Sequence, residues 1–572
     1  MLLARCFATA MLLVVFALTP CLQADDTKAE QERVVPEIRA TRVNPETPKI
    51  DGDLSDPFWQ THEFEIARDF IQMTPHEGEA ATESTVVAIG YDDDALYAAF
   101  WNYDSQPDKI KRQLARRDRY TESDRVQILL DTYHDHQTGY LFLVNAAGAQ
   151  RDFRIYNDGN MDQSWDAVWE GETKLQPWGW SAEIRIPYSC LRFSEKDEHT
   201  WGLNLIRTLS REAESTYWAF TPSSEGGVVS RFGHLTGLAG IKPATHFEIL
   251  PYTVSRLNTE TKNEGNTDGR DFAGDIGLDL KYGISSNLVL DATINPDFGQ
   301  VELDRPVLNL SSFETFYEEK RPFFLEGANL FHTPFHMFYS RRVGRSPRGW
   351  PDDVDYYTDR PSITTILGAG KLTGKLSDKT SIAILNAVTQ EERAEYVDES
   401  GIKREAVIEP KADYSVVRVT RDVLNGSSIG IMGTAVTQET AHPAMTAGVD
   451  WRIFTNDAAW GVRGQVVTSR VDSENTGFGL DMTFEKAAGT HVRGALGIEL
   501  YDPNLDLNDL GFLSRNDRRQ GWGWLQYRTQ EEWWIFRKTW NNVNGYAEWN
   551  YNGDRTGIGW NVNSNFEFMN YW

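Results

Sequence analysis

The sequence predicts an all-β protein, in which an N-terminal β-sandwich is followed by a C-terminal antiparallel transmembrane β-barrel. Three observations predict this class: apolar residues alternate with polar residues or glycine along many segments, helical periodicity is scarce, and the chain opens like a secreted protein. Successive side chains leave a strand on opposite faces. Many long strands with one apolar face therefore suit a barrel that contacts lipid outside and water inside.

The first 24 residues have the pattern of a signal peptide. Arg5 supplies a positive charge, the apolar run Met11 to Leu18 is too short to span a membrane, and Leu22-Gln23-Ala24 fits a cleavage site. Residues 25–42 are rich in charge and poor in apolar side chains, so we expect a flexible tether there.

Composition narrows the range of partners. The 572 residues suffice for two or three domains, and 57 Lys and Arg against 84 Asp and Glu give a net charge of −27. This charge argues against nucleic acid as a partner, because phosphates require a basic surface. Cys6 and Cys21 would leave with the signal peptide, so Cys190 would have no partner for an internal disulfide; lipidation at Cys21 is the alternative to cleavage at Ala24.

Residues 43–240 read as short strands separated by turn residues, which predicts the sandwich. Residues 245–572 contain about fourteen longer strands. They lie near 246–256, 275–284, 287–295, 364–376, 380–389, 413–420, 428–437, 447–454, 460–468, 477–485, 490–501, 521–529, 542–551 and 557–568. Short turns alternate with longer polar links such as 390–411, as expected when one end of a barrel faces the periplasm and the other faces outside.

The alternation stops at about 296–349. Phe313, Phe316 and Tyr317 fall at helical spacing in a stretch too long and too aromatic for a plain loop. Two interpretations stay open: a luminal constriction, or a surface loop with a short helix.

One local motif carries a family resemblance. The run from Lys49 to Trp59, Lys-Ile-Asp-Gly-Asp-Leu-Ser-Asp-Pro-Phe-Trp, resembles the opening of the family-nine carbohydrate-binding modules, and the likeness continues to Arg207. The second half resembles an uncharacterised family of Gram-negative outer-membrane barrels that carry this module, on the strength of Arg321 to Ala328 and Phe338 to Gly344. That family normally continues for further strands, so the barrel either closes within this chain or is truncated.

The resemblance implies a carbohydrate ligand and a carbohydrate-binding barrel of the cell outer membrane, in contact with its lipid. The expected role is glycan capture or passage in carbohydrate catabolism, with the N-terminal domain in the periplasm. One alternative is a hydrolase acting on O-glycosyl bonds, for which no catalytic residue stands out. Another is a structural envelope protein that docks a protein partner and has no sugar site. A third is a large soluble β protein.

Sugar binding requires flat aromatic side chains beside a few hydrogen-bonding groups. Trp165 lies in a polar stretch and is the first candidate, followed by Trp101 at a strand end and by Tyr133. Arg116 and Asn145 are the candidates for binding hydroxyl groups.

A calcium ion is the one cofactor that the resemblance suggests, because members of the resembled module family can bind it. Asp92, Asp94 and Asp104 could supply the oxygen ligands that calcium needs. The alternative for the aspartate-rich turn is an ordinary solvated hairpin.

Overall fold

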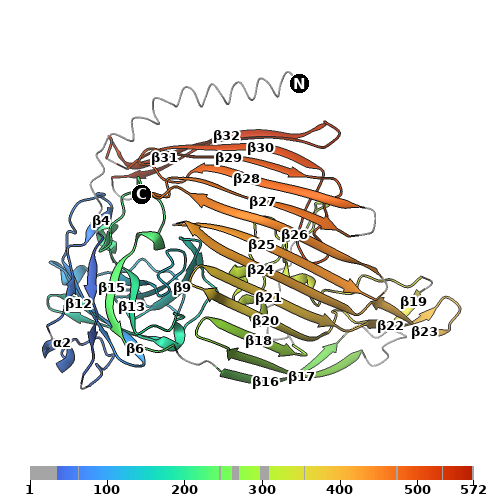
Figure 1. Ribbon diagram of the computed structural model, residues 1–572, viewed down its shortest axis with the longest axis horizontal. Coiled ribbons are helices and arrows are strands. Elements are labelled where there is room, and N and C mark those ends of the chain that lie inside the picture. The colour runs from blue at the N-terminus through green and yellow to red at the C-terminus, as the bar shows by residue number, and fades with distance from the viewer. Residues whose placement is uncertain are drawn as a thin grey trace.

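The computed structural model describes residues 35–569, with gaps at 45, 62, 244–246, 260–268, 297–307, 353, 425, 440, 472–474 and 531. The predicted signal peptide and most of the predicted tether lie outside the described residues. Figure 1 shows a sandwich at one end of a much larger sheet. The prediction of an all-β chain is confirmed, since four sheets contain nearly all of the regular structure. No helix in the described part of the chain is long and apolar enough to cross a membrane.

The sandwich contains fifteen strands in two sheets. They are β1 (Glu37–Arg39), β2 (Thr41–Arg42), β3 (Ile66–Ala67), β4 (Ile71–Thr74), β5 (Thr85–Tyr91), β6 (Ala95–Tyr103), β7 (Arg125–Asp131), β8 (Gly139–Asn145), β9 (Gln150–Tyr156), β10 (Asn160–Asp162), β11 (Glu170–Gln176), β12 (Gly179–Pro187), β13 (Glu198–Leu209), β14 (Glu214–Tyr217) and β15 (Gly233–Ala239). One sheet has the order β1-β15-β13-β7-β8-β9-β10 with β14 and β4 attached, and the other has the order β11-β12-β6-β5-β2 with β3 attached. Fully buried Phe100, Trp180 and Trp201 belong to the core between them.

The motif at 49–59 covers the outer face of the second sheet. Its short helix α2 (Pro57–Thr61) places Phe58 and Trp59 over Ala99 of β6. Glu183 of β12 holds the segment from below, because its carboxylate accepts the Gly52 backbone N–H at 2.9 Å and the Trp59 Nε1–H at 2.8 Å. The motif is therefore a cover that is hydrogen-bonded to a buried acid.

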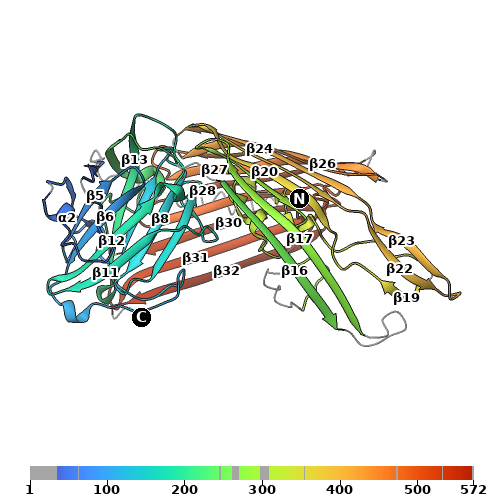
Figure 2. The same cartoon turned by 90° about the horizontal axis from the view of Figure 1, so that it is seen from below.

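The large sheet has fourteen antiparallel strands, and each corresponds to one that the sequence predicts. They are β16 (Phe247–Thr259), β17 (Arg270–Gly283), β18 (Leu288–Ile294), β20 (Ile366–Ser377), β21 (Thr380–Thr389), β24 (Ala412–Leu424), β25 (Ser427–Gln438), β26 (Ala441–Phe454), β27 (Trp460–Arg470), β28 (Thr476–Lys486), β29 (Val492–Tyr501), β30 (Arg518–Thr529), β31 (Phe536–Trp549) and β32 (Arg555–Phe568). In the described residues β16 and β32 are the edges. The sheet curves into a trough with these edges at its two borders (Figure 2).

The two faces of this sheet differ in chemistry. Ile431, Val449 and Val466 lie side by side on the convex face and are 55%, 46% and 46% exposed. On the opposite face their strand neighbours Met432 and Val467 are buried. The apolar flank thus points outward, away from the rest of the protein.

Residues 308–352 lie on the concave face. This segment contains α3 (Pro322–Leu325), η6 (Ala328–Phe331) and η7 (Ser340–Arg342). Phe324, Phe335 and Met337 pack against sheet residues from β20 to β29, and the Phe335 backbone N–H donates to Gln465 Oε1 at 2.8 Å. Within the part of the chain that is described, the segment therefore covers the middle of the inner wall.

The sequence did not predict the fourth sheet, which is formed by β19 (Val354–Asp359), β22 (Glu392–Asp398) and β23 (Lys403–Glu409). The hairpin of β22 and β23 occupies the link 390–411, which we expected to be a longer polar link between strands. This sheet lies at the end of the trough away from the sandwich (Figure 1).

The sandwich docks on the other end, where the short hairpin turns lie. Ser194 contacts Asn287 at 3.3 Å and Asp378 at 3.2 Å, in the turns after β17 and β20. Further along, the Gly226 backbone N–H donates to the Asp457 carbonyl at 2.9 Å, in the turn after β26. One compact domain therefore contacts turns that are spread over much of the curved rim.

Candidate functional site

A polar pocket of about 240 Å³ opens where the sandwich meets the large sheet. The sandwich contributes the segments 165–168 and 189–192, and the sheet contributes the end of β17 and the turn after it. Glu326, from the segment on the concave face, completes the lining. The pocket thus combines three parts of the chain that are far apart in sequence.

Trp165 supplies the aromatic wall. Its ring is half-buried and packs against Tyr140 of β8 at a centroid distance of 5.1 Å and against Phe142 at 5.9 Å. The loop that carries it is held by Asp152, which accepts the Ala167 backbone N–H at 3.1 Å and the Trp169 Nε1–H at 2.9 Å. Burial raises the pKa of the Asp152 carboxyl. The structure therefore places the first predicted candidate residue at a pocket, in a supported position.

Charged side chains line the opposite wall. Glu326 pairs with Lys281 at 2.7 Å and with Arg192 at 3.3 Å, so one carboxylate holds two cations from two different domains. The remaining N–H groups of Lys281 and Arg192 can donate to hydroxyl groups, and the Glu326 carboxylate can accept from them. An aromatic face beside such groups is the chemistry that a sugar requires. Sequence reasoning missed these three residues, because nothing in the sequence indicates that they converge.

The other predicted binding residues lie outside this pocket. Trp101 is on the outer face of the six-stranded sheet, edge-on to Trp59 at 6.4 Å. Asn145 is buried, and its Oδ1 accepts the backbone N–H groups of Ala147 and Ala149, each at 2.9 Å, so it shapes a turn. Arg116 is exposed in the loop before β7. Tyr133 is buried at the domain junction, where Lys375 Nζ lies 5.1 Å from the centre of its ring.

The three candidate calcium ligands do not converge. Asp92 accepts the Asp94 and Ala95 backbone N–H groups, each at 2.8 Å, and so closes a hairpin turn. Asp104 is buried elsewhere and pairs with Arg211 at 2.6 Å. Among the described residues, no group of three or more His, Cys, Asp and Glu side chains has a geometry suited to a metal ion.

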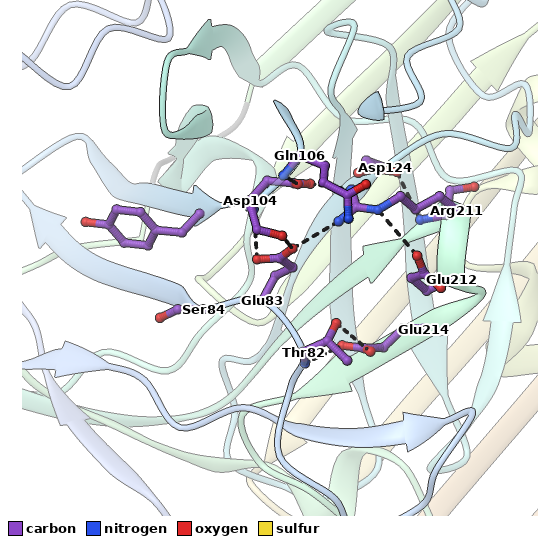
Figure 3. Close-up of polar contacts among 12 residues, drawn as sticks. Thr82, Glu83, Ser84, Asp104, Gln106, Asp124, Arg211, Glu212 and Glu214 are labelled. Atoms are coloured by element: carbon purple, nitrogen blue, oxygen red, sulfur yellow. Dashed lines mark hydrogen bonds and ion pairs between the residues drawn. The ribbon is translucent and has the colours of Figure 1, made fainter. Parts of the chain in front are cut away.

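Arg211 is the centre of a second polar cluster, shown in Figure 3. Besides Asp104 it binds Glu83 at 3.0 Å, and Glu214 nearby accepts the Thr82 hydroxyl at 2.9 Å. Burial raises the pKa of the Glu214 carboxyl and also that of Asp124. The arginine guanidinium occupies the space between the carboxylates, so this cluster joins strand ends within the sandwich.

An aromatic pair lies beside this cluster. Tyr103 is 40% exposed, and its ring lies 5.0 Å from that of Trp178 at an angle of 46°. The backbone next to Tyr103 is held to Trp178 by the hydrogen bond from the Asp104 N–H to the Trp178 carbonyl, at 2.9 Å. This pair is a second aromatic surface that could stack on a sugar ring.

The architecture defines a class of two-part β proteins, in which a sandwich with a junction pocket caps an amphipathic antiparallel sheet. A family model described as a domain of unknown function, DUF5916, matches residues 243–572. The chain belongs to this family. No curated protein matches the chain.

Several solved structures are similar to parts of the chain. A family 9 carbohydrate-binding module from Caldicellulosiruptor kristjanssonii in complex with cellotriose shares 20% identity over 35% of this chain and 93% of its own, with a TM-score of 0.27. A putative carbohydrate-binding protein from Bacteroides uniformis shares 12% identity over 36% of this chain and 99% of its own, with a TM-score of 0.30. The outer membrane protein OpdK from Pseudomonas aeruginosa shares 9% identity over 78% of this chain and 88% of its own, with a TM-score of 0.26.

Proposed function

We propose that this protein is a carbohydrate-binding protein of the bacterial outer membrane, in which the sandwich captures a glycan at one mouth of the curved sheet. The observation that carries the proposal is the junction pocket, where the indole of Trp165 faces a set of charged hydrogen-bonding groups. A sugar presents C–H patches on its ring faces and hydroxyl groups at its edges. The pocket offers a partner for each.

The convex face of the sheet supports the membrane part of the proposal. A row of exposed Ile and Val side chains crosses β25, β26 and β27. Water-soluble proteins rarely leave so long an apolar surface uncovered, whereas a strand that faces lipid requires it. The opposite face carries ion pairs such as Arg418 with Asp450 at 2.6 Å, as expected of a wet interior.

The position of the sandwich supports an orientation. Barrels of the outer membrane have short turns on the periplasmic side and longer loops outside. The sandwich binds the short turns, and the three-stranded sheet and the long links lie at the other end. We therefore place the sandwich in the periplasm, where it would meet a glycan that enters or leaves through the trough.

Isothermal titration of the full chain in detergent micelles tests the proposal. The probes are cellohexaose, maltohexaose and xylohexaose. We expect the wild type to bind at least one of them, Trp165→Ala to weaken that binding about tenfold, and Trp178→Ala to leave it unchanged. If only Trp178→Ala loses binding, the sugar site is at the Tyr103–Trp178 pair and not at the junction pocket. No binding of any of the three sugars to the wild type would contradict the proposal.

A further inference from the structure

The inner wall formed by β30, β31 and β32 differs from the rest of the trough. The segment 308–352 packs on strands from β20 to β29, where Phe335 lies 5.0 Å from Tyr501, whereas Tyr546 of β31 is 41% exposed and Asn561 and Asn563 of β32 are exposed. Strand register places these side chains on the concave face. Gln465 contacts the covering segment and so lies on that face. It pairs with Asp481, which pairs with Glu499, which in turn pairs with Gln520 of β30. Trp522 and Trp524 follow Gln520 at alternate positions, so they share its face.

Aromatic side chains follow this wall along the strand direction. Trp522 of β30 is directly opposite Tyr546 of β31, and Trp524 is opposite Asn544. Trp540 lies on the same face, closer to the turn where the sandwich docks. From Trp540 to Tyr546 the strand rises about 20 Å, at ~3.3 Å per residue. The rings therefore form a line along the wall.

Two of these rings lie flat on the sheet, because glycine is opposite them. The Trp522 indole covers Gly497 of β29, and the Tyr546 ring covers Gly559 of β32; in both places the ring occupies the space that a Cβ would need. A ring that lies against the backbone on one side presents its other face to the trough. A larger residue in place of either glycine would turn the ring on edge.

Carboxamides fill the positions between the rings. Asn542 Oδ1 accepts the Trp524 Nε1–H at 3.0 Å and the Gln526 amide at 2.9 Å, and Asn542 Nδ2 donates to Asn563 Oδ1 at 2.9 Å. Asn544 donates to Asn561 Oδ1 at 2.9 Å. The ladder is neutral and runs across all three strands, and each amide has both donor and acceptor atoms.

We propose that this surface, the aromatic–amide track of Trp522, Trp524, Trp540, Tyr546, Asn542 and Asn544, binds neutral oligosaccharides along the trough. The inference rests on the proposed function and extends it from capture by the sandwich to passage along the wall. Flat rings bind the apolar faces of successive sugar units, and uncharged amides bind their hydroxyls. The six side chains are uncharged, so they bind a sugar by stacking and by neutral hydrogen bonds.

The track starts where the sandwich docks. Arg528, which is opposite Trp540 in the next strand, donates to the Ser223 carbonyl of the sandwich at 3.3 Å. A glycan released from the sandwich would therefore meet the Trp540 end of the track first.

The test is isothermal titration of the full chain in micelles with maltohexaose and cellohexaose. The variant is Trp522→Leu with Trp524→Leu, and Trp522→Phe with Trp524→Phe keeps flat rings at both positions. Trp560→Leu is the matched control, because Trp560 lies on the convex face of β32 and is 80% exposed. We expect the leucine variant to bind at least tenfold more weakly, the phenylalanine variant to retain most of the affinity, and the control to equal the wild type.

A second measurement keeps the proposal testable if the leucine variant does not fold. In Asn544→Cys, made in a chain whose three native cysteines are replaced by serine, bound hexasaccharide should slow maleimide labelling severalfold. Labelling of Val562→Cys on the convex face, in the same background, should not change. The wild type could bind sugar while the leucine variant keeps the wild-type affinity and bound sugar leaves the labelling rate unchanged. That result would contradict the track but not capture by the sandwich. If the wild type binds none of cellohexaose, maltohexaose and xylohexaose, the proposed function is contradicted, and the proposed track is contradicted with it.

Discussion

Lys375 of β20 and Asp135 of the sandwich form an ion pair across the domain junction, with Nζ and Oδ2 2.6 Å apart. Their side chains are 7% and 2% exposed, so the pair is shielded from water. Asp135 also accepts the backbone N–H groups of Gln137 and Thr138, each at 2.7 Å, and thereby orders its own loop. A single lysine from the sheet thus stabilises both the loop and the docking of the sandwich.

Lys375→Met tests this contact. The change leaves the Asp135 carboxylate buried without its cation, which costs about 3–5 kcal/mol when a buried pair loses one partner. We expect the loop 132–138 to exchange its amide hydrogens faster, as measured by hydrogen–deuterium exchange, while the sandwich core around Trp201 stays protected. Lys403→Met removes a solvent-exposed pair with Glu395 and should change nothing measurable. Equal exchange rates in the wild type and Lys375→Met would show that the pair does not hold the junction.

Glu183 makes the sandwich sensitive to pH. Burial beneath the 49–59 motif raises the pKa of its carboxyl to about 7, from the usual value near 4.5. Between these two pH values the folded chain binds more protons than the unfolded chain. The free energy of unfolding therefore falls as pH rises from about 4.5 to 7 and then levels off, as far as this group is concerned. Chemical denaturation at a series of pH values, followed by tryptophan fluorescence, measures this slope.

Glu183→Gln isolates the contribution of the charge. The amide NH2 of glutamine would face the N–H groups of Gly52 or Trp59, both of which need an acceptor. We expect a loss of about 1–3 kcal/mol at low pH and a flatter pH profile, because the titrating group is gone. A variant with the wild-type slope would show that another group causes the pH dependence.

Adjacent residues of β32 offer a direct comparison of the two faces of the sheet. Val562 is on the convex face and 59% exposed, whereas Asn561 is on the concave face. Val562→Lys should impair folding into lipid vesicles by about 2–4 kcal/mol, because lysine on a lipid-facing position near the bilayer midplane is costly. Asn561→Lys should fold into vesicles like the wild type. Folding is followed by the heat-dependent shift in gel mobility, and equal behaviour of both variants would contradict the assignment of the faces.

The alternation of residues predicted the large sheet well. All fourteen strands were expected from their period of two, because a sheet with one apolar and one polar face keeps that period along its whole length. The hairpin of β22 and β23 was missed, because its sequence is charged on both faces and lacks this contrast. Similarly, nothing local indicates that Ser194 or Gly226 docks on distant turns.

The candidate site was predictable only in part. Trp165 stood out as an aromatic residue in a polar stretch, and the structure places it at a pocket. Arg192, Lys281 and Glu326 could not be predicted from the sequence, because they are 45 or more residues apart and meet only when the sandwich docks on the sheet. Asn145 was predicted as a binding residue, but its side chain shapes a turn. The sequence alone does not distinguish such an asparagine from one that is available to a ligand. The track on β30–β32 was likewise hidden, since strand register decides which ring faces which glycine.

The central claim is that lipid covers the convex face while water fills the trough. Spin labels on Val449→Cys and Asn544→Cys test it, in a chain whose three cysteines are replaced by serine and which is reconstituted in lipid vesicles. Power-saturation electron paramagnetic resonance measures collisions of each label with oxygen, which concentrates in lipid, and with a water-soluble nickel chelate. The account predicts that oxygen relaxes the label at 449 and the nickel chelate relaxes the label at 544. Strong nickel relaxation at 449, with none at 544, would contradict it.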